Sequence, residues 1–206
     1  MKVVVIGLTG GPGTGKSTVA AMLARRGAAV IEADRLGHQA YAPGTAGWEA
    51  VVRAFGPEVI APDGTIDRRR LGALVFSDPE KLRRLNAIIH PEIRRLITVQ
   101  LEKFRREGVR VVVIEAALLF EAGWDDLVDE VWVTTAPPDV AAARYAARTG
   151  LPEAEVRQRV AAQLDAAEKV RRADRIIDTS GSLANVERQV DRLWNELLSR
   201  AARQDP

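Results

Sequence analysis

The 206-residue chain contains no cysteine and only two histidines, His38 and His90. Without cysteine there can be no disulfide bond and no zinc site built from thiolates, and two histidines are too few for a histidine-rich metal centre. The absence of cysteine is also typical of a reducing compartment, so we expect a cytoplasmic protein.

The sequence also lacks long apolar runs. None approaches the roughly 20 residues that a membrane-spanning helix needs, and residues 1–8 are too short and too soon interrupted by glycine to form a signal peptide. The 30 basic and 28 acidic residues leave a net charge of +2, which argues against the strongly basic surface of a dedicated nucleic-acid binder. We therefore expect neither a membrane nor a nucleic acid as a partner.

Five short runs of mainly β-branched residues predict buried strands at residues 2–8, 28–32, 110–115, 130–135 and 175–178. Helical patterns occupy intervening segments at residues 17–26, 35–40, 91–106, 139–148, 152–172 and 183–203. Strands that alternate with helices indicate an α/β fold, with a five-stranded, mostly parallel sheet covered by helices on both faces. Ligands bind such sheets at the carboxyl ends of the strands.

Residues 34–106 carry little strand pattern and are interrupted by several turn signals that contain glycine or proline. We interpret this segment as a helical insertion, in which His90-Pro91 marks a helix boundary before the long helix at residues 91–106. No linker divides the chain, so residues 1–206 are expected to form a single unit. Its nucleotide-binding core would comprise residues 1–33, 107–138 and 173–206.

The segment Gly10–Ser17 matches the phosphate-loop pattern G-x-x-x-x-G-K-[ST] without a mismatch. Its glycines allow backbone N–H groups to surround phosphates, Lys16 would reach the β- and γ-phosphates, and the Ser17 hydroxyl would hold Mg²⁺. A buried strand before the pattern and a helix after it supply the required context, and the helix adds the positive end of its dipole. The residues expected to bind the nucleotide are Gly11, Gly13, Thr14, Gly15, Lys16, Ser17 and Thr18.

Missing signatures narrow the class of phosphate-loop protein. The base-reading Asn-Lys-x-Asp of GTPases is absent, and so is the signature of transport ATPases. Asp34–Gly37 fits the loose GTPase pattern D-x-x-G, but that pattern is common by chance. The leading interpretation is a kinase that acts on a small molecule.

Two carboxylates follow predicted strands. Asp34 comes directly after the second strand, where a kinase needs a carboxylate to orient the acceptor hydroxyl and accept its proton. A helix N-cap is the structural alternative for Asp34, and the two roles can coexist. Glu115 ends the third strand, where it would either hold Mg²⁺ through water or be a solvated charge.

Phosphoryl transfer also needs cations around the equatorial oxygens of the moving group. Arg144 and Arg148 lie four residues apart on one face of a predicted helix, and Arg157 and Arg159 follow in the next helix. One or two of these arginines would form a lid over ATP, and a solvated helix face is the alternative. The arginine clusters of the insertion are either a surface for an anionic acceptor or solvent-facing helix surface.

Taken together, these features resemble the dephospho-CoA kinase family nearly from end to end. The resemblance begins at Leu8–Ser17 and continues with Asp34 and His38. The further matching positions, in the family's order, are Phe55-Gly56, Asp63–Arg68, Leu71, Val75-Phe76, Leu85-Asn86, His90-Pro91, Leu118–Glu121, Arg144, Arg148, Arg159, Gln163, Ala173-Asp174, Ile177-Asp178 and Gly181-Ser182.

Three positions depart from the family's usual residues. Glu115 stands where the family usually has an aspartate; it keeps the charge but extends further. Ala117 replaces a proline, which is expected to loosen one turn without changing the chemistry. Thr179 replaces a common asparagine near the place where the family binds adenine.

The resemblance implies the P-loop nucleotide-kinase fold, with a helical insertion at residues 34–106 that binds the CoA substrate and a helical lid at residues 139–172. The implied reaction moves the γ-phosphoryl group of ATP to the ribose 3′-hydroxyl of dephospho-CoA, with Mg²⁺ as cofactor. The implied catalytic residues are Lys16, Asp34, Arg144 and Arg148. The implied substrate-binding residues are Thr9, Asp34, His38, Arg68, His90, Leu118 and Phe120. Mg²⁺ would be held by Ser17 and, through water, by Glu115.

Two alternatives stay open at this point. One is another phosphate-loop kinase that acts on a nucleoside or nucleotide, which would lack the segments Asp63–Arg68 and Leu118–Glu121. The other, less favoured, is an ATP-binding module associated with nucleic acid, which predicts strongly salt-dependent binding to nucleic acid. A monomer or a small homo-oligomer is expected in either case.

Overall fold

The computed structural model describes residues 3–150 and 163–204 of the chain. The elements described run in the order β1 (Val4–Thr9), α1 (Lys16–Arg25), β2 (Ala29–Glu32), α2 (Ala33–Ala40), α3 (Ala46–Phe55), η1 (Pro57–Val59), α4 (Arg68–Phe76), α5 (Pro79–Arg106), β3 (Val111–Glu115), η2 (Trp124–Leu127), β4 (Glu130–Thr135), α6 (Pro138–Thr149), α8 (Ala166–Arg171), β5 (Arg175–Asp178) and α9 (Leu183–Gln204).

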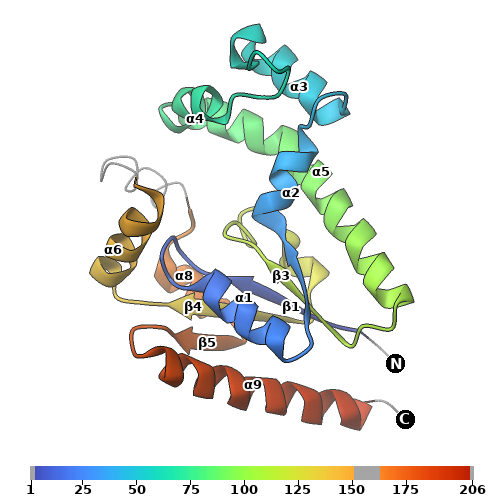
Figure 1. Ribbon diagram of the computed structural model, residues 1–206, viewed down its shortest axis with the longest axis vertical. Coiled ribbons are helices and arrows are strands. Elements are labelled where there is room, and N and C mark those ends of the chain that lie inside the picture. Colours follow the sequence, from blue (N-terminus) through green and yellow to red (C-terminus); the bar gives the residue numbers. More distant parts are fainter. Residues whose placement is uncertain (1–2, 151–162, 205–206) are drawn as a thin grey trace. The chain divides into compact units, whose positions relative to one another are not determined.

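The strands form one sheet in the order β2-β3-β1-β4-β5, and every neighbouring pair is parallel (Figure 1). This confirms the predicted α/β class with its five-stranded parallel sheet. β1 is the central strand, with β3 on one side and β4 on the other. The chain therefore leaves β1 at the middle of the sheet's carboxyl edge, where open parallel sheets bind their ligands.

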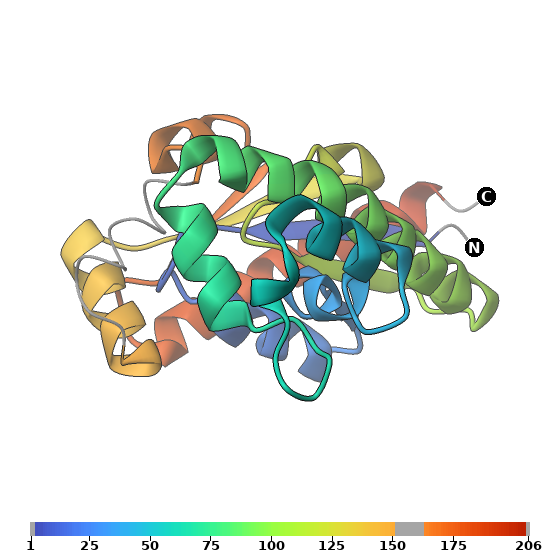
Figure 2. The ribbon, with the colours of Figure 1, turned by 90° about the horizontal axis from the view of Figure 1, so that it is seen from above.

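Helices cover both faces of this sheet. Alternate residues of β1, Ile6 and Leu8, are fully buried in a core that includes Leu23 of α1 and Trp194 of α9. Helix α8 packs against β4, and Figures 1 and 2 show it on the face opposite to α9. Within residues 3–150 and 163–204, no helix combines the length and apolar character needed to cross a membrane.

The chain divides into two compact units, Met1–Glu32 with Leu101–Pro206, and Ala33–Gln100. The first unit contains the whole sheet. The second is helical and has a core of its own, built from Val51, Phe55, Val59, Ile66, Leu71, Val75 and Leu85. Each unit therefore buries its own apolar side chains.

Helix α5 begins earlier than predicted, because it runs unbroken over Pro79–Arg106 and includes Pro91. The predicted helix boundary at His90-Pro91 is wrong. A proline inside a helix removes one hydrogen bond and costs about 3 kcal/mol. Leu85 and Ile93, on either side of the proline, are both buried. Burial of the apolar face along the whole length of the helix outweighs the local cost at Pro91.

The prediction of a single helix over residues 152–172 is also wrong for its second half. Residues 163–165 are not helical, and a new helix, α8, begins at Ala166. Asp165 is the N-cap of α8, because its carboxylate accepts a hydrogen bond of 2.8 Å from the backbone N–H of Ala167. The earlier part of the predicted helix, residues 152–162, lies outside the described residues.

Candidate active site

The phosphate loop joins the carboxyl end of β1 to the first residue of α1, as the sequence pattern predicts. Gly13 and Gly15 have φ angles of 75° and 82°, in the left-handed region that favours glycine. A Cβ atom at Gly13 would also overlap the backbone carbonyl of Ala141 in α6. Glycine at this position therefore bends the loop and also allows α6 to approach it.

Lys16 holds its ammonium group against the loop. Nζ donates to the carbonyl oxygens of Gly10, at 2.7 Å, and Gly11, at 3.1 Å. Ser17 and Thr18 are exposed in the first turn of α1, and this turn contains no acidic residue. A cation, a hydroxyl and the positive end of a helix dipole are thus presented together, which is an arrangement suited to phosphates.

A set of buried threonines supports the loop from within the protein. The Thr14 hydroxyl lies 2.8 Å from the carbonyl oxygen of Gly11, to which it donates, and 2.8 Å from Thr134 Oγ1. Thr134 is 1% exposed, and its hydroxyl lies 3.3 Å from the carbonyl oxygen of Thr9. Thr134 gives no functional signal in the sequence, because threonine in a β-branched strand such as Glu130–Thr135 cannot be distinguished from an ordinary core residue.

Arg144 lies on α6 and binds the turn that follows β5. Its guanidinium donates to the hydroxyl and to the carbonyl oxygen of Thr179, at 3.2 and 3.0 Å. The Thr179 hydroxyl in turn lies 3.0 Å from the carbonyl oxygens of Thr14 and Thr135. Thr179, noted above only as a departure from the family pattern, therefore connects α6 to the phosphate loop.

The other lid arginines differ in their surroundings. Arg148 is exposed on α6, and its guanidinium lies 5.2 Å from the centre of the Tyr145 ring. Arg157 and Arg159 fall outside the described residues. The role expected of Arg144, Arg148, Arg157 and Arg159 at the phosphates therefore stays a prediction.

Acidic side chains stand at the carboxyl ends of two neighbouring strands. Glu115 of β3 pairs in register with Leu8 of β1 on one side and with Glu32 of β2 on the other. In the part of the chain that the structure describes, no group of three histidine, aspartate or glutamate side chains could hold a metal by itself. The metal-binding roles expected of Ser17 and Glu115 therefore stay predictions.

The loop after β3 carries the expected substrate residues Leu118 and Phe120. Leu118 is half-buried, whereas Phe120 is only 7% exposed, with the Arg172 guanidinium 4.1 Å from the centre of its ring. Thr9 is fully buried, and its hydroxyl donates to the carbonyl oxygen of Ala117 at 3.5 Å. Thr9 thus supports this loop through a backbone contact.

The unit Ala33–Gln100 contains the remaining predicted residues. Asp34 lies inside the first turn of α2, which begins at Ala33, so its alternative role as the N-cap of that helix is wrong. One turn later, His38 Nε2 lies 2.6 Å from Arg68 Nη1 at the start of α4. Burial lowers the pKa of His38 below its usual value, and the Arg68 guanidinium lowers this pKa further. His90 is half-buried on α5.

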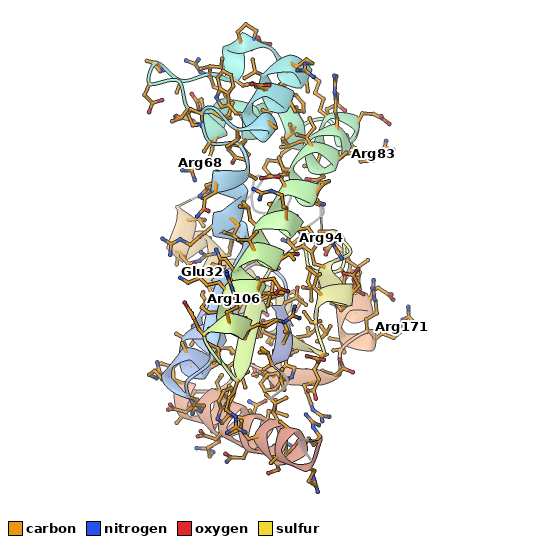
Figure 3. The ribbon with its side chains drawn as sticks, turned by 90° about the vertical axis from the view of Figure 1, so that its right-hand side faces the viewer. Glu32, Arg68, Arg83, Arg94, Arg106 and Arg171 are labelled. Carbon is orange, nitrogen blue, oxygen red and sulfur yellow. The ribbon has the colours of Figure 1, made fainter. Side chains whose placement is uncertain are left out.

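Many of the other arginines of this unit face solvent. Figure 3 shows the Arg83 side chain extending outward from α5, where it is 72% exposed and paired with Glu80. Arg95 is 60% exposed and pairs with Glu92 on the same helix. These two arginines therefore match the alternative of a solvent-facing helix surface.

The parallel sheet, the phosphate loop after its central strand and the arginine-bearing helix beside that loop define a P-loop kinase of the nucleotide-kinase type. Within this class, the chain belongs to the dephospho-CoA kinase family, whose family model, described as "Dephospho-CoA kinase", matches residues 4–185. The resemblance seen in the sequence is therefore confirmed.

Individual proteins are similar to this chain over most of its length. A dephospho-CoA kinase from Symbiobacterium thermophilum is 51% identical over 190 residues, which cover 92% of this chain and 80% of that protein. The crystal structure of TT1252 from Thermus thermophilus is 39% identical, with a TM-score of 0.79 and coverage of 96% of this chain and 99% of that one. A dephospho-CoA kinase structure from Campylobacter jejuni is 27% identical, with a TM-score of 0.68 and coverage of 94% and 96%.

Proposed function

We propose that the protein transfers the γ-phosphoryl group of ATP to the ribose 3′-hydroxyl of dephospho-CoA and thereby forms coenzyme A. The observation that carries this proposal is the family match over residues 4–185, because it includes both the phosphate loop and the helical unit. The phosphate loop alone would support only a nucleotide-binding protein. We assign the helical unit at residues 33–100 to binding of the acceptor. We assign the lid at residues 139–172 to closing over ATP.

Lys16 and Ser17 are assigned to the phosphates of ATP. Lys16 would exchange the carbonyl oxygens of Gly10 and Gly11 for phosphate oxygens, since a hydrogen bond between two ionised groups is stronger than one to a neutral carbonyl. Ser17, with Glu115 through water, would hold Mg²⁺, which when bound neutralises charge on the phosphate oxygens.

Asp34 is assigned to the acceptor hydroxyl. It would orient the 3′-hydroxyl towards the γ-phosphorus and accept its proton as the new bond forms. Arg144 and Arg148 would supply positive charge to the transferring group. The residues assigned to the acceptor are Thr9, His38, Arg68, His90, Leu118 and Phe120.

One assay tests the reaction. Purified protein with Mg-ATP is offered dephospho-CoA beside a panel of nucleosides and nucleoside monophosphates, and the products are separated and quantified. We expect coenzyme A and ADP in equal amounts with dephospho-CoA. Turnover of a nucleotide without turnover of dephospho-CoA would assign the protein to another kinase family of the same fold.

The role of Asp34 is tested by Asp34→Asn, which removes the proton acceptor and keeps the shape. Turnover with dephospho-CoA should fall by about 10²- to 10⁴-fold, while the ATP dissociation constant, measured by calorimetry, should change little. Asp191→Asn serves as the control, because Asp191 is a surface carboxylate of α9 that pairs with Arg26, the C-cap residue of α1. Near-normal turnover of Asp34→Asn would show that Asp34 is not the base.

A further inference from the structure

Lys169 of α8 is buried, with 1% of its surface exposed, and it is the only charged residue with this degree of burial in the part of the chain that the structure describes. A buried charge is costly unless hydrogen bonds replace the lost water. Its ammonium group has three N–H donors and three acceptors. These are the carbonyl oxygen of Ala117 at 2.8 Å, Gln163 Oε1 at 3.2 Å and Glu121 Oε1 at 3.1 Å.

The acceptors Ala117 and Glu121 are the two ends of the loop that contains Leu118 and Phe120. The carbonyl oxygen of Ala117 also receives the hydroxyl of Thr9, the last residue of β1 before the phosphate loop. Lys169 therefore holds both ends of the loop, and one of these ends also contacts the strand that leads into the phosphate loop.

The third acceptor belongs to Gln163, which precedes helix α8. Gln163 and Leu164 are the first described residues after position 162. Leu164 donates its backbone N–H to Glu121 Oε1 at 2.6 Å, and this is the same oxygen that faces Lys169. The Glu121 side chain is only 19% exposed. Its carboxylate, the Lys169 ammonium group and the Leu164 backbone N–H therefore form one shielded cluster.

Apolar side chains at both positions of the ion pair would avoid its desolvation cost, since replacement of both partners of a buried ion pair by well-packed apolar residues is often neutral or stabilising. Another ion pair of the same helix, Arg171 with Glu168, differs from the Lys169–Glu121 pair in its exposure to solvent. Arg171 is 74% exposed and points away from the protein (Figure 3). Stability alone therefore does not account for a lysine at position 169.

We infer that Lys169 is a positioning residue for phosphoryl transfer: it holds the loop Ala117–Glu121 in place beside the end of β1 and ties Gln163 to this loop. This inference rests on the proposed function, because the loop matters for catalysis only if it contacts the acceptor. An acceptor hydroxyl displaced by about 1 Å can cost about 100-fold in rate.

Lys169→Met tests the inference, and Arg171→Met is the matched control on the same helix. For Lys169→Met we expect kcat/KM for dephospho-CoA to fall about 10- to 100-fold, with a higher KM for this acceptor and an ATP dissociation constant within about threefold of that of the parent protein. Arg171→Met should leave all three constants unchanged. If Lys169 had a purely structural role, Lys169→Met would lower the melting temperature and the active fraction of the protein without raising the KM for dephospho-CoA.

The double variant Lys169→Met with Glu121→Gln separates positioning from the penalty of an unpaired carboxylate. If Lys169 only neutralised Glu121, the double variant would recover the acceptor KM of the parent protein, and the inference would be overturned. We expect it to recover thermal stability while its KM stays high. Should Lys169→Met fail to fold, Gln163→Leu keeps the ion pair and is expected to raise the same KM by a smaller factor; an unchanged KM would overturn the inference.

Amide hydrogen exchange gives a readout that does not depend on catalysis. In the double variant, the amides of residues 117–121 and of Leu164 should exchange faster than in the parent protein, and those of β4 should not. Unchanged exchange at residues 117–121 contradicts the inference whatever the activity. An inactive parent protein whose exchange pattern responds as expected would instead refute the proposed function.

Discussion

His38 illustrates how its surroundings shift the charge state of a side chain: desolvation is the main cause, and the contact with Arg68 adds to it. The guanidinium of Arg68 can only donate, so the contact with a ring nitrogen of His38 requires that nitrogen to be unprotonated. Burial and the nearby positive charge both oppose the imidazolium form, and the pKa of His38 is lowered as a result. At neutral pH the pair therefore carries one positive charge, on Arg68.

The pKa of His38 should respond to Arg68→Ala. The parent protein should titrate below 6.5, the ordinary value for histidine, and the variant should titrate closer to it, because one of the two main causes of the shift is gone. Nuclear magnetic resonance resolves this easily, since His90 is the only other histidine and serves as the internal control. An unchanged His38 pKa in the variant would contradict the role of Arg68.

The sign of the pH effect on stability follows from the same shift. Between the folded-state pKa and 6.5 the unfolded chain binds more protons at His38 than the folded chain does. The contribution of His38 to stability is therefore complete above about pH 6.5 and is lost as the pH falls through the folded-state pKa. Arg68→Ala should narrow the pH range over which this contribution to stability is lost, as measured by denaturant titrations between pH 5 and 7.

At the scale of elements, the notable feature is how closely α6 approaches the phosphate loop. Two contacts hold it there: the backbone of Ala141 against Gly13, and the guanidinium of Arg144 on Thr179. Thr179 extends the connection to the carbonyl oxygens of Thr14 and Thr135. Helix α6, which carries Arg144 and Arg148, is thus held close to the phosphate loop.

Thr179→Val tests this anchor, because it removes the hydroxyl and keeps the shape. The variant leaves buried polar groups unsatisfied, at a cost of about 1–3 kcal/mol, so both the melting temperature and the affinity for ATP should fall. Thr98→Val is the control, since the exposed Thr98 hydroxyl bonds only to the Arg94 carbonyl of its own helix among the described contacts. Equal effects of the two substitutions on ATP affinity would contradict the proposed connection.

At the scale of the whole molecule, the described part of the chain has separate apolar clusters in its two compact units. The unit that contains the sheet packs α1 and α9 against one face, whereas residues 33–100 bury a separate apolar cluster. We expect the two units to respond separately to core substitutions, because each contains an apolar cluster of its own.

Leu71→Ala and Leu23→Ala form a pair that tests this independence. Leu71 is 3% exposed in the core of the helical unit, and Leu23 is fully buried beneath the sheet. Each substitution should cost about 2–5 kcal/mol. Leu71→Ala should reduce amide protection within residues 33–100 and leave ATP affinity nearly unchanged, whereas Leu23→Ala should weaken both ATP binding and protection in the sheet. Identical exchange profiles for the two variants would show one cooperative unit.

Local patterns were sufficient for several parts of this protein. The predicted strands at residues 130–135 and 175–178 coincide with β4 and β5. In β4, residues 131–134 are buried, and β-branched residues are typical of such a parallel strand. Gly10–Ser17 identified the phosphate loop, since the conformation depends on glycines and the chemistry on Lys16 and Ser17 within one short segment. The family, and with it the acceptor, also followed from residues in sequence order.

Only the tertiary structure revealed the contacts that join distant segments. The sequence predicted a helix boundary at Pro91, but burial of a long apolar face carries the helix through it. Thr134 and Lys169 showed no signal in the sequence, because their partners lie up to 125 and 52 positions away. A local pattern specifies how the chain bends and which side chains are available. Whether a buried hydroxyl or ammonium group finds its acceptors depends on which segments the fold brings together, and this is decided by the packing of the whole sheet.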